Sequence, residues 1–483
     1  MIECLGYRGD LQDRQALAAR LCEAGLGAEA ASARAERFAE AAAALATREP
    51  RAADRRPLAF FVPGRIEVLG KHTDYAGGHT IVCAIDRGFL FLASANAPGT
   101  VRMVEDSPEF APLEFPLGSE IVPPLGSWAN YPMTMAQRIV ANFGKGAVKT
   151  GVDIAFSSDM PVGSGMSGSS ALMMLTFCAI SWLNRLHETE RFRANIRGGI
   201  DLAMYLACAE NGQSFRDLAG GRGVGTFGGS EDHTAILNCR KGRLSLYQYA
   251  PTVAKAEMEW PSDWAIVIAF SGVRAEKTRE ALEKYNLASR RASRAVEAYN
   301  REYGTGFGNL REVLGSARGV SESRWLREIE ARLSGDPGLG LPERIRQFLR
   351  EERTHMPRAI RALLWRDIEG FGAALNASHG DSRRYLWNIA PEIDSLKKSA
   401  LALGASGATG FGAGFGGSIM AVLPVDRADS FAAAWQSAYA RRHPALAERA
   451  SFFRTETGSG ILLWDSRGAA RWVDRMFSSE ERD

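Results

Sequence analysis

The chain has 483 residues, of which 46% are hydrophobic and 24% charged, and its formal net charge is +3. This composition is typical of a soluble globular protein of two to three domains, and so small a charge gives no reason to expect nucleic acid or an anionic membrane as a partner. Six scattered cysteines, with no CxxC pair and no histidine at metal spacing, argue against a zinc site or a disulfide framework. The N-terminus lacks a signal-peptide pattern, and the longest apolar stretch, Ala171 to Leu183, is shorter than the about 20 residues of a membrane span. We therefore expect a cytoplasmic protein.

Along the chain, residues 11–48 are rich in Ala, Leu, Arg and Glu and predict one or two amphipathic helices. Compact apolar runs predict strands at Leu58 to Val62 (ended by Pro63-Gly64), Thr80 to Ile85, Val152 to Phe156, Trp264 to Phe270, Ser418 to Leu423 and within 451–463. Further helices are predicted at 171–186, 200–210, 274–302, 307–375 with an interruption at 334–342, and 426–441.

Strands and helices alternate without a strict βαβ rhythm, which predicts an α+β fold with two lobes. The boundary between the lobes is expected between residues 245 and 262, where the character of the chain changes. We predict a helical N-terminal extension at 1–57, an N-terminal domain at 58–250 and a C-terminal domain at 251–483.

Residues 161–174, PVGSGMSGSSALMM, place small residues directly before a helix. Successive backbone N–H groups of such a segment can point into one concavity with the helix N-terminus behind them, which is a geometry that binds phosphate. The segment is not a Walker A loop, because the lysine is missing, and it lacks the context of a dinucleotide-binding fingerprint. A flexible surface turn is the alternative interpretation.

Residues 64–78, GRIEVLGKHTDYAGG, place five polar side chains between two predicted strands: Arg65, Glu67, Lys71, His72 and Asp74. This density indicates that a polar ligand is held there, and a solvated hairpin with a local ion pair is an equal alternative. Residues 407–422, GATGFGAGFGGSIMAV, are dense in glycine, which permits close backbone approach, but this signal alone is weak.

Together and in this order, the three segments resemble the signature motifs of the GHMP kinase superfamily, and of galactokinases in particular. Residues 64–78 are similar to the family's GRxNxIGEHxDYxxG, 161–171 to its PxGxGLSSSA, and 411–418 to its TGxGFGGC. Smaller matches are SWANYP at 127–132, FGGSEDHTAIL at 227–237 and NASHGDSRRYLWNIAPEIDSL at 376–396. The resemblance spans residues 60 to 460 and implies the two-lobed GHMP kinase fold, with ATP bound by the N-terminal domain.

The resemblance implies a kinase that transfers the γ-phosphate of ATP to the anomeric hydroxyl of a sugar. Asp232 matches the aspartate that accepts the proton of that hydroxyl. Arg65 matches the arginine that lowers the hydroxyl's pKa and offsets the negative charge of the transferring phosphate.

The resemblance also implies ATP and Mg²⁺ as cofactors. It assigns the metal to Ser169 and Glu210, although an insertion lies between Glu210 and Asp232 relative to the family. It assigns the nucleotide to Trp128 near the adenine and to residues of the small-residue segment, namely Gly163, Ser164, Gly165, Ser167, Gly168, Ser169 and Ser170.

For the sugar, the resemblance implies contacts from Lys71, His72, Asp74, Gly229 and Tyr285. Lys71 stands where galactokinases have a glutamate that approaches the hydroxyl on carbon six. Three interpretations follow. Lys71 hydrogen-bonds a neutral hexose, which we rank first; it pairs with the carboxylate of a uronate such as galacturonate; or it forms a salt bridge with Glu67 and faces away from the sugar.

The predicted function is therefore a Mg·ATP-dependent 1-kinase of galactose or a related monosaccharide. The alternatives are a uronate 1-kinase, a catalytically silent sugar sensor of galactokinase type, and a GHMP kinase of another substrate such as mevalonate or homoserine. The presence of Arg65 and Asp232 argues against the sensor, and the GKHTDY and WANY segments favour a sugar. Residues 1–55 and 305–360 exceed what a compact galactokinase needs and are candidates for added packing or for contacts in a homo-oligomer.

Overall fold

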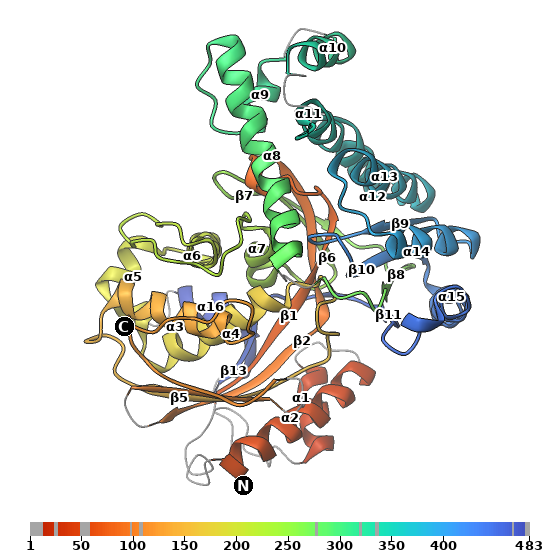
Figure 1. The fold of residues 1–483 in the computed structure, drawn as a ribbon. Helices are drawn as coiled ribbons and strands as arrows, with labels where there is room; N and C mark the ends of the chain where they lie inside the picture. The colour runs from red at the N-terminus through yellow and green to blue at the C-terminus, as the bar shows by residue number, and fades with distance from the viewer. Residues whose placement is uncertain are drawn as a thin grey trace.

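The chain folds around two β-sheets that carry helices on their faces (Figure 1). The computed structural model describes residues 13–23, 28–48, 58–96, 99–105, 110–275, 279–317, 321–333, 338–465 and 468–478. Strands and helices alternate irregularly along the chain, as the sequence predicts, and the fold class is α+β. Parts of the predicted N-terminal extension, at 1–12, 24–27 and 49–57, lie outside the described residues.

The larger sheet has the strand order β14-β13-β1-β2-β5-β3-β4, with β6 and β12 also pairing with β2, and β7 with β6. Strands β3 and β5 run parallel, and the other neighbouring pairs within the described residues run antiparallel. The strands are β1 (Leu58–Leu69), β2 (His79–Asn96), β3 (Thr100–Glu105), β4 (Leu113–Pro116), β5 (Gly151–Ser158), β6 (Arg243–Gln248), β7 (Val253–Glu259), β12 (Thr457–Gly458), β13 (Leu462–Asp465) and β14 (Gly468–Arg471).

The first strand is longer than the sequence predicts, and this correction matters for the site. We expected it to end at Pro63-Gly64, but β1 continues to Leu69 because the register shifts between Pro63 and Arg65. A local irregularity of this kind accommodates a proline within a ladder. The extension places Arg65 on a buried strand rather than on an exposed loop.

Alternate residues of β1 point to opposite faces of the sheet. Phe60 and Val62 contribute to the main core, whereas Ala59 and Phe61 pack against the two N-terminal helices. Those helices, α1 (Arg14–Glu23) and α2 (Ala28–Arg48), confirm the helical prediction for this region where it is described. The helices that contribute to the main core include α3 (Asn130–Phe143), α4 (Gly168–Leu183), α5 (Glu190–Asn195), α6 (Gly199–Asn211), α7 (Glu231–Asn238) and α16 (Trp472–Phe477).

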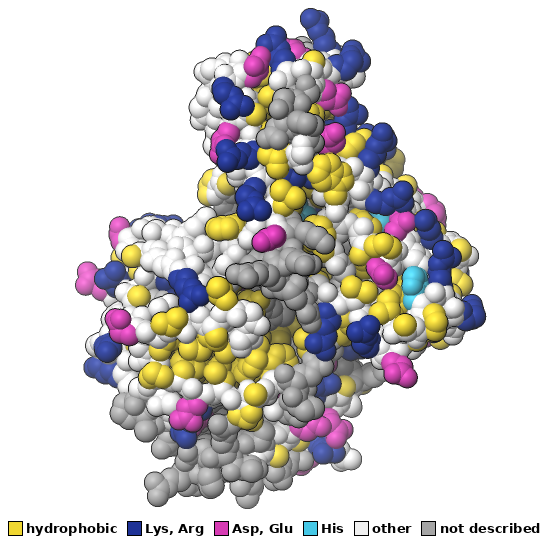
Figure 2. Space-filling view, viewed as in Figure 1, with side chains coloured by type: hydrophobic (Ala, Val, Ile, Leu, Met, Phe, Trp, Pro, Cys, Tyr) yellow, Lys and Arg dark blue, Asp and Glu magenta, His cyan; other side chains and the backbone are white. Residues whose placement is uncertain are grey.

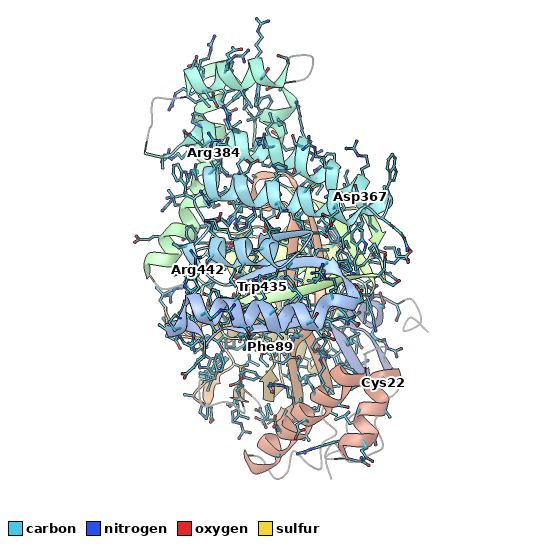
Figure 3. The ribbon with its side chains drawn as sticks, turned by 90° about the vertical axis from the view of Figure 1, so that its right-hand side faces the viewer. Cys22, Phe89, Asp367, Arg384, Trp435 and Arg442 are labelled. Atoms are coloured by element: carbon cyan, nitrogen blue, oxygen red, sulfur yellow. The ribbon has the colours of Figure 1, made fainter. Side chains whose placement is uncertain are left out.

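The smaller sheet has the order β11-β8-β10-β9 and is antiparallel throughout. Trp435, labelled in Figure 3, is fully buried beside this sheet and donates its indole N–H to Leu396 O over 3.1 Å. The elements of this region are β8 (Trp264–Phe270), β9 (Gly407–Gly410), β10 (Ser418–Pro424), β11 (Ser451–Thr455), α12 (Met356–Leu364), α13 (Ile368–Asp381), α14 (Pro391–Ala402) and α15 (Ala428–Arg442).

The C-terminal segment returns to the larger sheet, where β13 pairs with β1 and β12 with β2. β7, at Val253–Glu259, also belongs to the larger sheet. The predicted domains 1–57, 58–250 and 251–483 stay a prediction. Strands near both ends of the range 251–483 belong to the larger sheet, which is otherwise built from the range 58–250.

Four helices form a projection with its own apolar core, which includes Ala76 of the loop between β1 and β2. Within the described residues, no helix combines the length and the hydropathy needed to cross a membrane. On the face shown in Figure 2, Lys and Arg side chains are mixed with Asp and Glu over most of the surface. The four helices are α8 (Arg279–Tyr303), α9 (Leu310–Gly315), α10 (Glu322–Arg332) and α11 (Leu341–Arg350).

Candidate active site

The three segments singled out in the sequence meet in space. Arg65 on β1 donates an Nη1–H to Gly165 O over 2.8 Å. Ser418 donates its hydroxyl to Ser164 O over 2.7 Å. A Cβ on Gly412 would lie 2.6 Å from Gly165 O, so this approach of two backbones requires glycine. The loop after β1, the loop before α4 and the glycine-rich loop before β10 therefore form one site.

At this meeting point Arg65 pairs with Asp232, in the first turn of α7. The Nε–H donates to Asp232 Oδ1 over 2.8 Å, and Nε lies 3.6 Å from Glu231 Oε1. Burial opposes the charge of Arg65, but the carboxylates of Asp232, Glu231 and Glu67 outweigh it and raise the pKa of the guanidinium. The arginine side chain is 5% exposed and that of Asp232 is 34% exposed, so the carboxylate can be reached from solvent while the cation is enclosed.

Two further acids lie beside the pair. Asp74 Oδ2 accepts the backbone N–H of Glu231 over 3.4 Å. Burial raises the pKa of Asp74 to about 6, against the backbone N–H of Tyr75, while the charge of Asp232 adds to the rise. Burial, reinforced by the nearby charges of Glu67 and Asp74, raises the pKa of Glu231 well above its ordinary value. Arg65 thus lies among several carboxyl groups that do not all ionise together.

The predicted sugar contacts Asp74, Gly229 and Tyr285 are brought together. Any side chain on Gly229 would collide with the carboxylate of Asp74. Tyr285 on α8 lies against Gly228, where an added Cβ would be 2.7 Å from the phenol oxygen. Its ring centroid is 6.0 Å from that of His72. These residues line one side of the Arg65–Asp232 pair, because Asp74 contacts the first turn of α7.

His72 is a bridge between two of the loops. Its Nε2 lies 3.1 Å from Ala413 O and its Nδ1 lies 2.8 Å from the Tyr75 hydroxyl. A carbonyl only accepts, so Nε2 carries the hydrogen and Nδ1 accepts from Tyr75. Burial lowers the pKa of His72 to about 4, which keeps the ring neutral.

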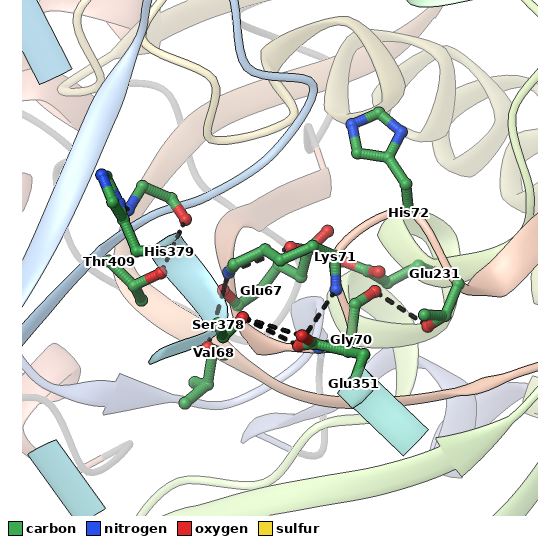
Figure 4. A network of polar contacts seen from close by, with 12 residues as sticks. Glu67, Val68, Gly70, Lys71, His72, Glu231, Glu351, Ser378, His379 and Thr409 are labelled. Carbon is green, nitrogen blue, oxygen red and sulfur yellow. Dashed lines mark hydrogen bonds and ion pairs between the residues drawn. The ribbon is translucent and has the colours of Figure 1, made fainter. Parts of the chain in front are cut away.

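The side chain of Lys71 does not have the position that our first-ranked interpretation, a hydrogen bond to a neutral hexose, requires. Its Nζ is 3.0 Å from Glu67 Oε1 and donates to Glu67 O over 2.9 Å and to Val68 O over 3.4 Å (Figure 4). The ammonium donates two of its three hydrogens to these backbone carbonyls, and it is paired by charge with the Glu67 carboxylate. The lysine side chain is 3% exposed. The geometry favours the third interpretation, in which Lys71 pairs with Glu67 and faces away from the sugar.

The segment before α4 has the geometry of an anion-binding loop. Gly163, Gly165 and Ser167 adopt left-handed backbone conformations, with φ of 69°, 79° and 63°, and α4 begins at Gly168. Alternation of this kind turns successive N–H groups toward one side, in front of the helix N-terminus. The buried hydroxyl of Ser167 has no hydrogen-bond partner in the structure, which leaves a donor for a ligand.

The predicted metal ligand Glu210 lies against a serine in the first turn of α4. Glu210, near the C-terminal end of α6, accepts the hydroxyl of Ser170 through Oε2 over 2.8 Å, and His233 Nε2 lies 3.1 Å from the same oxygen. Ser170 therefore contacts Glu210, and the predicted role of its neighbour Ser169 in the metal site stays a prediction. One carboxylate with serine hydroxyls is a hard oxygen donor set and fits Mg²⁺, which keeps waters and phosphate oxygens as its other ligands. The described residues hold no group of three or more His, Cys, Asp or Glu side chains placed to bind a metal.

Trp128, predicted to lie near the adenine, belongs to an aromatic cluster. Its ring centroid lies 5.4 Å from that of Phe110 and 6.0 Å from that of Phe156. The cluster extends to Phe89, which would touch a Cβ on Gly168 at 4.0 Å. Trp128 thus lies on the α4 side of the site, and its contact with adenine stays a prediction.

Sequence reasoning missed Arg274. The structure places its side chain against Gly163, and Ala275 donates its N–H to Gly163 O over 2.7 Å. The signal was present, since Arg274 follows the predicted strand Trp264 to Phe270, and strand ends carry ligand-binding residues. Arg274 adds a cation beside the loop predicted to bind phosphate.

Comparison with known families agrees with this geometry. The galactose-binding signature of galactokinases matches residues 51–95, the N-terminal domain of GHMP kinases matches residues 130–207, and the C-terminal domain of GHMP kinases matches residues 359–441. Galactokinase of Enterococcus faecalis is 28% identical over 389 residues, covering 79% of this chain and 89% of that protein. Galactokinase of Exiguobacterium sibiricum is 29% identical over 412 residues, covering 83% and 92%.

Solved structures share the fold. The crystal structure of Lactococcus lactis galactokinase complexed with galactose superposes with a TM-score of 0.69 at 24% identity, covering 87% of this chain and 99% of that one. Mevalonate kinase of Methanococcus jannaschii superposes with a TM-score of 0.50 at 14% identity, covering 83% and 98%. The predicted two-lobed GHMP kinase fold is confirmed.

Proposed function

We propose that the chain, which resembles galactokinases and matches models of GHMP kinase domains, is an ATP-dependent kinase that phosphorylates the anomeric hydroxyl of a neutral monosaccharide, galactose or a close relative. The observation that carries the proposal is the Arg65–Asp232 pair, because it lies where the three glycine-rich or polar loops meet. Galactokinase relatives support a sugar as the acceptor.

In the proposed reaction, Asp232 takes the proton of the sugar hydroxyl as its oxygen bonds to the γ-phosphorus of ATP. The bond from that phosphorus to the β,γ-bridging oxygen breaks, and ADP leaves. Arg65, a permanent cation beside Asp232, stabilises the developing alkoxide and the charge on the transferring group.

The loop before α4 holds the phosphates through its backbone N–H groups and the N-terminus of the helix. Glu210 and Ser170 would hold Mg²⁺, with Ser169 adjacent in sequence, and the metal when bound neutralises phosphate charge. The indole of Trp128 is proposed to flank the adenine.

The charge of the site supports a neutral sugar over a uronate. The predicted sugar contact Asp74 lies beside Asp232 and Glu231, and Arg65 is already paired. The one lysine of the first loop is used by Glu67, Glu67 O and Val68 O. Among the described residues, a uronate carboxylate would meet further carboxylates, while Arg65 and Lys71 are already paired with acids, which is an unfavourable arrangement.

The test is an ADP-release assay with Mg·ATP against galactose, other neutral hexoses, arabinose, galacturonate and glucuronate, followed by ³¹P NMR of the product. We expect turnover of a neutral sugar and a phosphate coupled to the anomeric carbon. If the protein turns over only uronates, the substrate is an acidic sugar and the proposal of a neutral sugar is wrong. Binding of ATP and sugar without turnover would replace the kinase by a sensor.

A further inference from the structure

The loop between β1 and β2, residues 70–78, is held by one face of a neighbouring helix. Arg344 and Gln347 lie on α11, and Glu351 begins the π-helical turn Glu351–His355 that follows it. The spacings of three and four residues put the three side chains on one helical face. All three are completely buried.

Each of these side chains bonds the main chain of the loop. Glu351 Oε1 accepts the N–H of Gly70 over 2.8 Å and lies 3.5 Å from the N of Lys71. Gln347 donates from Nε2 to Lys71 O over 3.0 Å. Arg344 donates from Nη2 to the carbonyl of His72. Three consecutive residues of the loop are thus bound in order along the helix.

The three side chains also support one another. Arg344 donates from Nη1 to Gln347 Oε1, which orients the amide so that its NH₂ faces Lys71 O. Glu351 accepts the hydroxyl of Ser378 on α13 over 2.9 Å (Figure 4). A second acid, Glu352, accepts the backbone N–H of His79 where β2 begins. The loop is therefore fixed at both ends.

The fixed backbone is a strained one. His72 has φ of 56°, a left-handed conformation that a residue with a Cβ adopts at a cost. Such a conformation persists where the surroundings over-determine it, and here the carbonyl of His72 is bound by Arg344 while its ring bonds Ala413 O. The bound segment leads directly into Asp74, the acid beside Asp232.

We propose that Arg344, Gln347 and Glu351 are positioning residues for sugar recognition, forming a clamp that sets the backbone of Gly70–His72 and through it the place of Asp74. The proposal rests on the proposed function for its substrate, a neutral monosaccharide. It assigns a role to part of the region 305–360, which in the sequence is only an unexplained addition. The clamp acts on the sugar side of the site, since none of its bonds reaches the loop before α4.

Gln347→Met tests the clamp, because methionine keeps the length of the side chain and removes both hydrogen bonds. We expect the sugar KM to rise about tenfold, the size of one lost buried hydrogen bond, while the ATP KM changes by less than about twofold. Amide exchange of peptides covering 66–80, followed by mass spectrometry without substrate, should accelerate. Gln347→Glu, which keeps the acceptor for Arg344 but turns an oxygen toward Lys71 O, should give the same pattern if the methionine variant folds poorly.

Glu351→Gln is the conservative partner, because its amide oxygen still accepts from Gly70 N and its effect on sugar KM should be the smaller. Trp435→Phe is the matched control for lost stability: it removes the hydrogen bonds of Trp435 to Leu396 O and to Ser399, far from the loop. This control variant should lower the melting temperature without raising the sugar KM relative to the ATP KM.

An unchanged sugar KM with unchanged exchange of residues 66–80 in a folded Gln347 variant overturns the clamp. An equal rise of both KM values also overturns it, since a general loosening would do this. If the unmodified protein turns over no sugar, the proposed function fails, and the exchange measurement alone then decides whether the helix holds the loop.

Discussion

Two cation–carboxylate pairs lie close together on the first strand and the loop that follows it, and they differ in what surrounds them. In the Arg65–Asp232 pair the cation is enclosed and the carboxylate is about one-third exposed. In the Lys71–Glu67 pair both side chains are enclosed, at 3% and 6% exposed. The first pair can meet a substrate, whereas the second can only hold the loop in place.

The comparison shows that a charged residue in a motif is available to a ligand only if its burial and its partners leave it accessible. In the Lys71–Glu67 pair the cation is buried, bonded to backbone carbonyls and neutralised by its partner, so the pair is not exposed to a ligand. A pair with one exposed carboxylate keeps an acceptor for an incoming proton while its cation remains fixed in a low-dielectric environment. Four predictions follow from this contrast.

Asp232→Asn should have the largest effect, because the amide keeps the shape but cannot take a proton. We expect kcat to fall about 1,000-fold or more, with little change in melting temperature. Steady-state ADP release at saturating sugar and ATP measures it. Asp217→Asn, at an exposed aspartate, is the matched control. Retention of more than a tenth of the activity by Asp232→Asn would remove this residue from the role of base.

Lys71→Met should affect stability rather than catalysis. It leaves Glu67 buried without its cation, which costs about 3 kcal/mol of unfolding free energy. Denaturant unfolding measures the loss, and adding Glu67→Gln should recover part of it. The preference for neutral sugars over uronates should not change. A shift of that preference in Lys71→Met would contradict the interpretation of the pair as internal.

Arg65→Lys tests the enclosed cation of the first pair. Lysine keeps the charge but cannot bond Asp232 and Gly165 O at the same time in the geometry of the guanidinium. We expect kcat to fall about 100-fold while both substrates still bind. If kcat stays within a few-fold of the unmodified protein, charge alone suffices and the fork geometry is irrelevant.

The smallest effect concerns the pH dependence of Asp74, whose pKa is raised by burial to about 6. Below about pH 6 the protonated carboxyl is a poorer acceptor, so the sugar KM should rise by a few-fold as pH falls through this value. The folded state binds more protons here than the unfolded one, so stability from this group decreases as pH rises from about 4 to about 6. Asp74→Asn should flatten both profiles, and unchanged profiles would exclude Asp74 as their source.

Local patterns were sufficient for much of the fold and for the family. Apolar runs identified the buried strands β5, β8 and β10, and the small residues before α4 indicated a phosphate-binding loop whose left-handed residues the structure contains. These features depend on near neighbours in the chain, because burial periodicity and glycine content act locally. The resemblance of the motifs extended the prediction to the GHMP fold.

The orientation of side chains was harder to predict from the sequence. The charged residues of 64–78 do not by themselves show which cation is available to a ligand: the resemblance pointed to Arg65, but it left three interpretations open for Lys71, which faces Glu67. The contact between Ser170 and Glu210 likewise depends on where the first turn of α4 points relative to α6.

The sequence by itself determined the fold class and the segments that form the site, because both depend on local composition and spacing, and the resemblance of its motifs indicated the family. Tertiary structure alone decided which charges are available. Arg344, Gln347 and Glu351 lie far along the chain from Gly70–His72, and no local pattern connects them. Availability depends on burial and on partners supplied by distant elements, and those are properties of the folded chain.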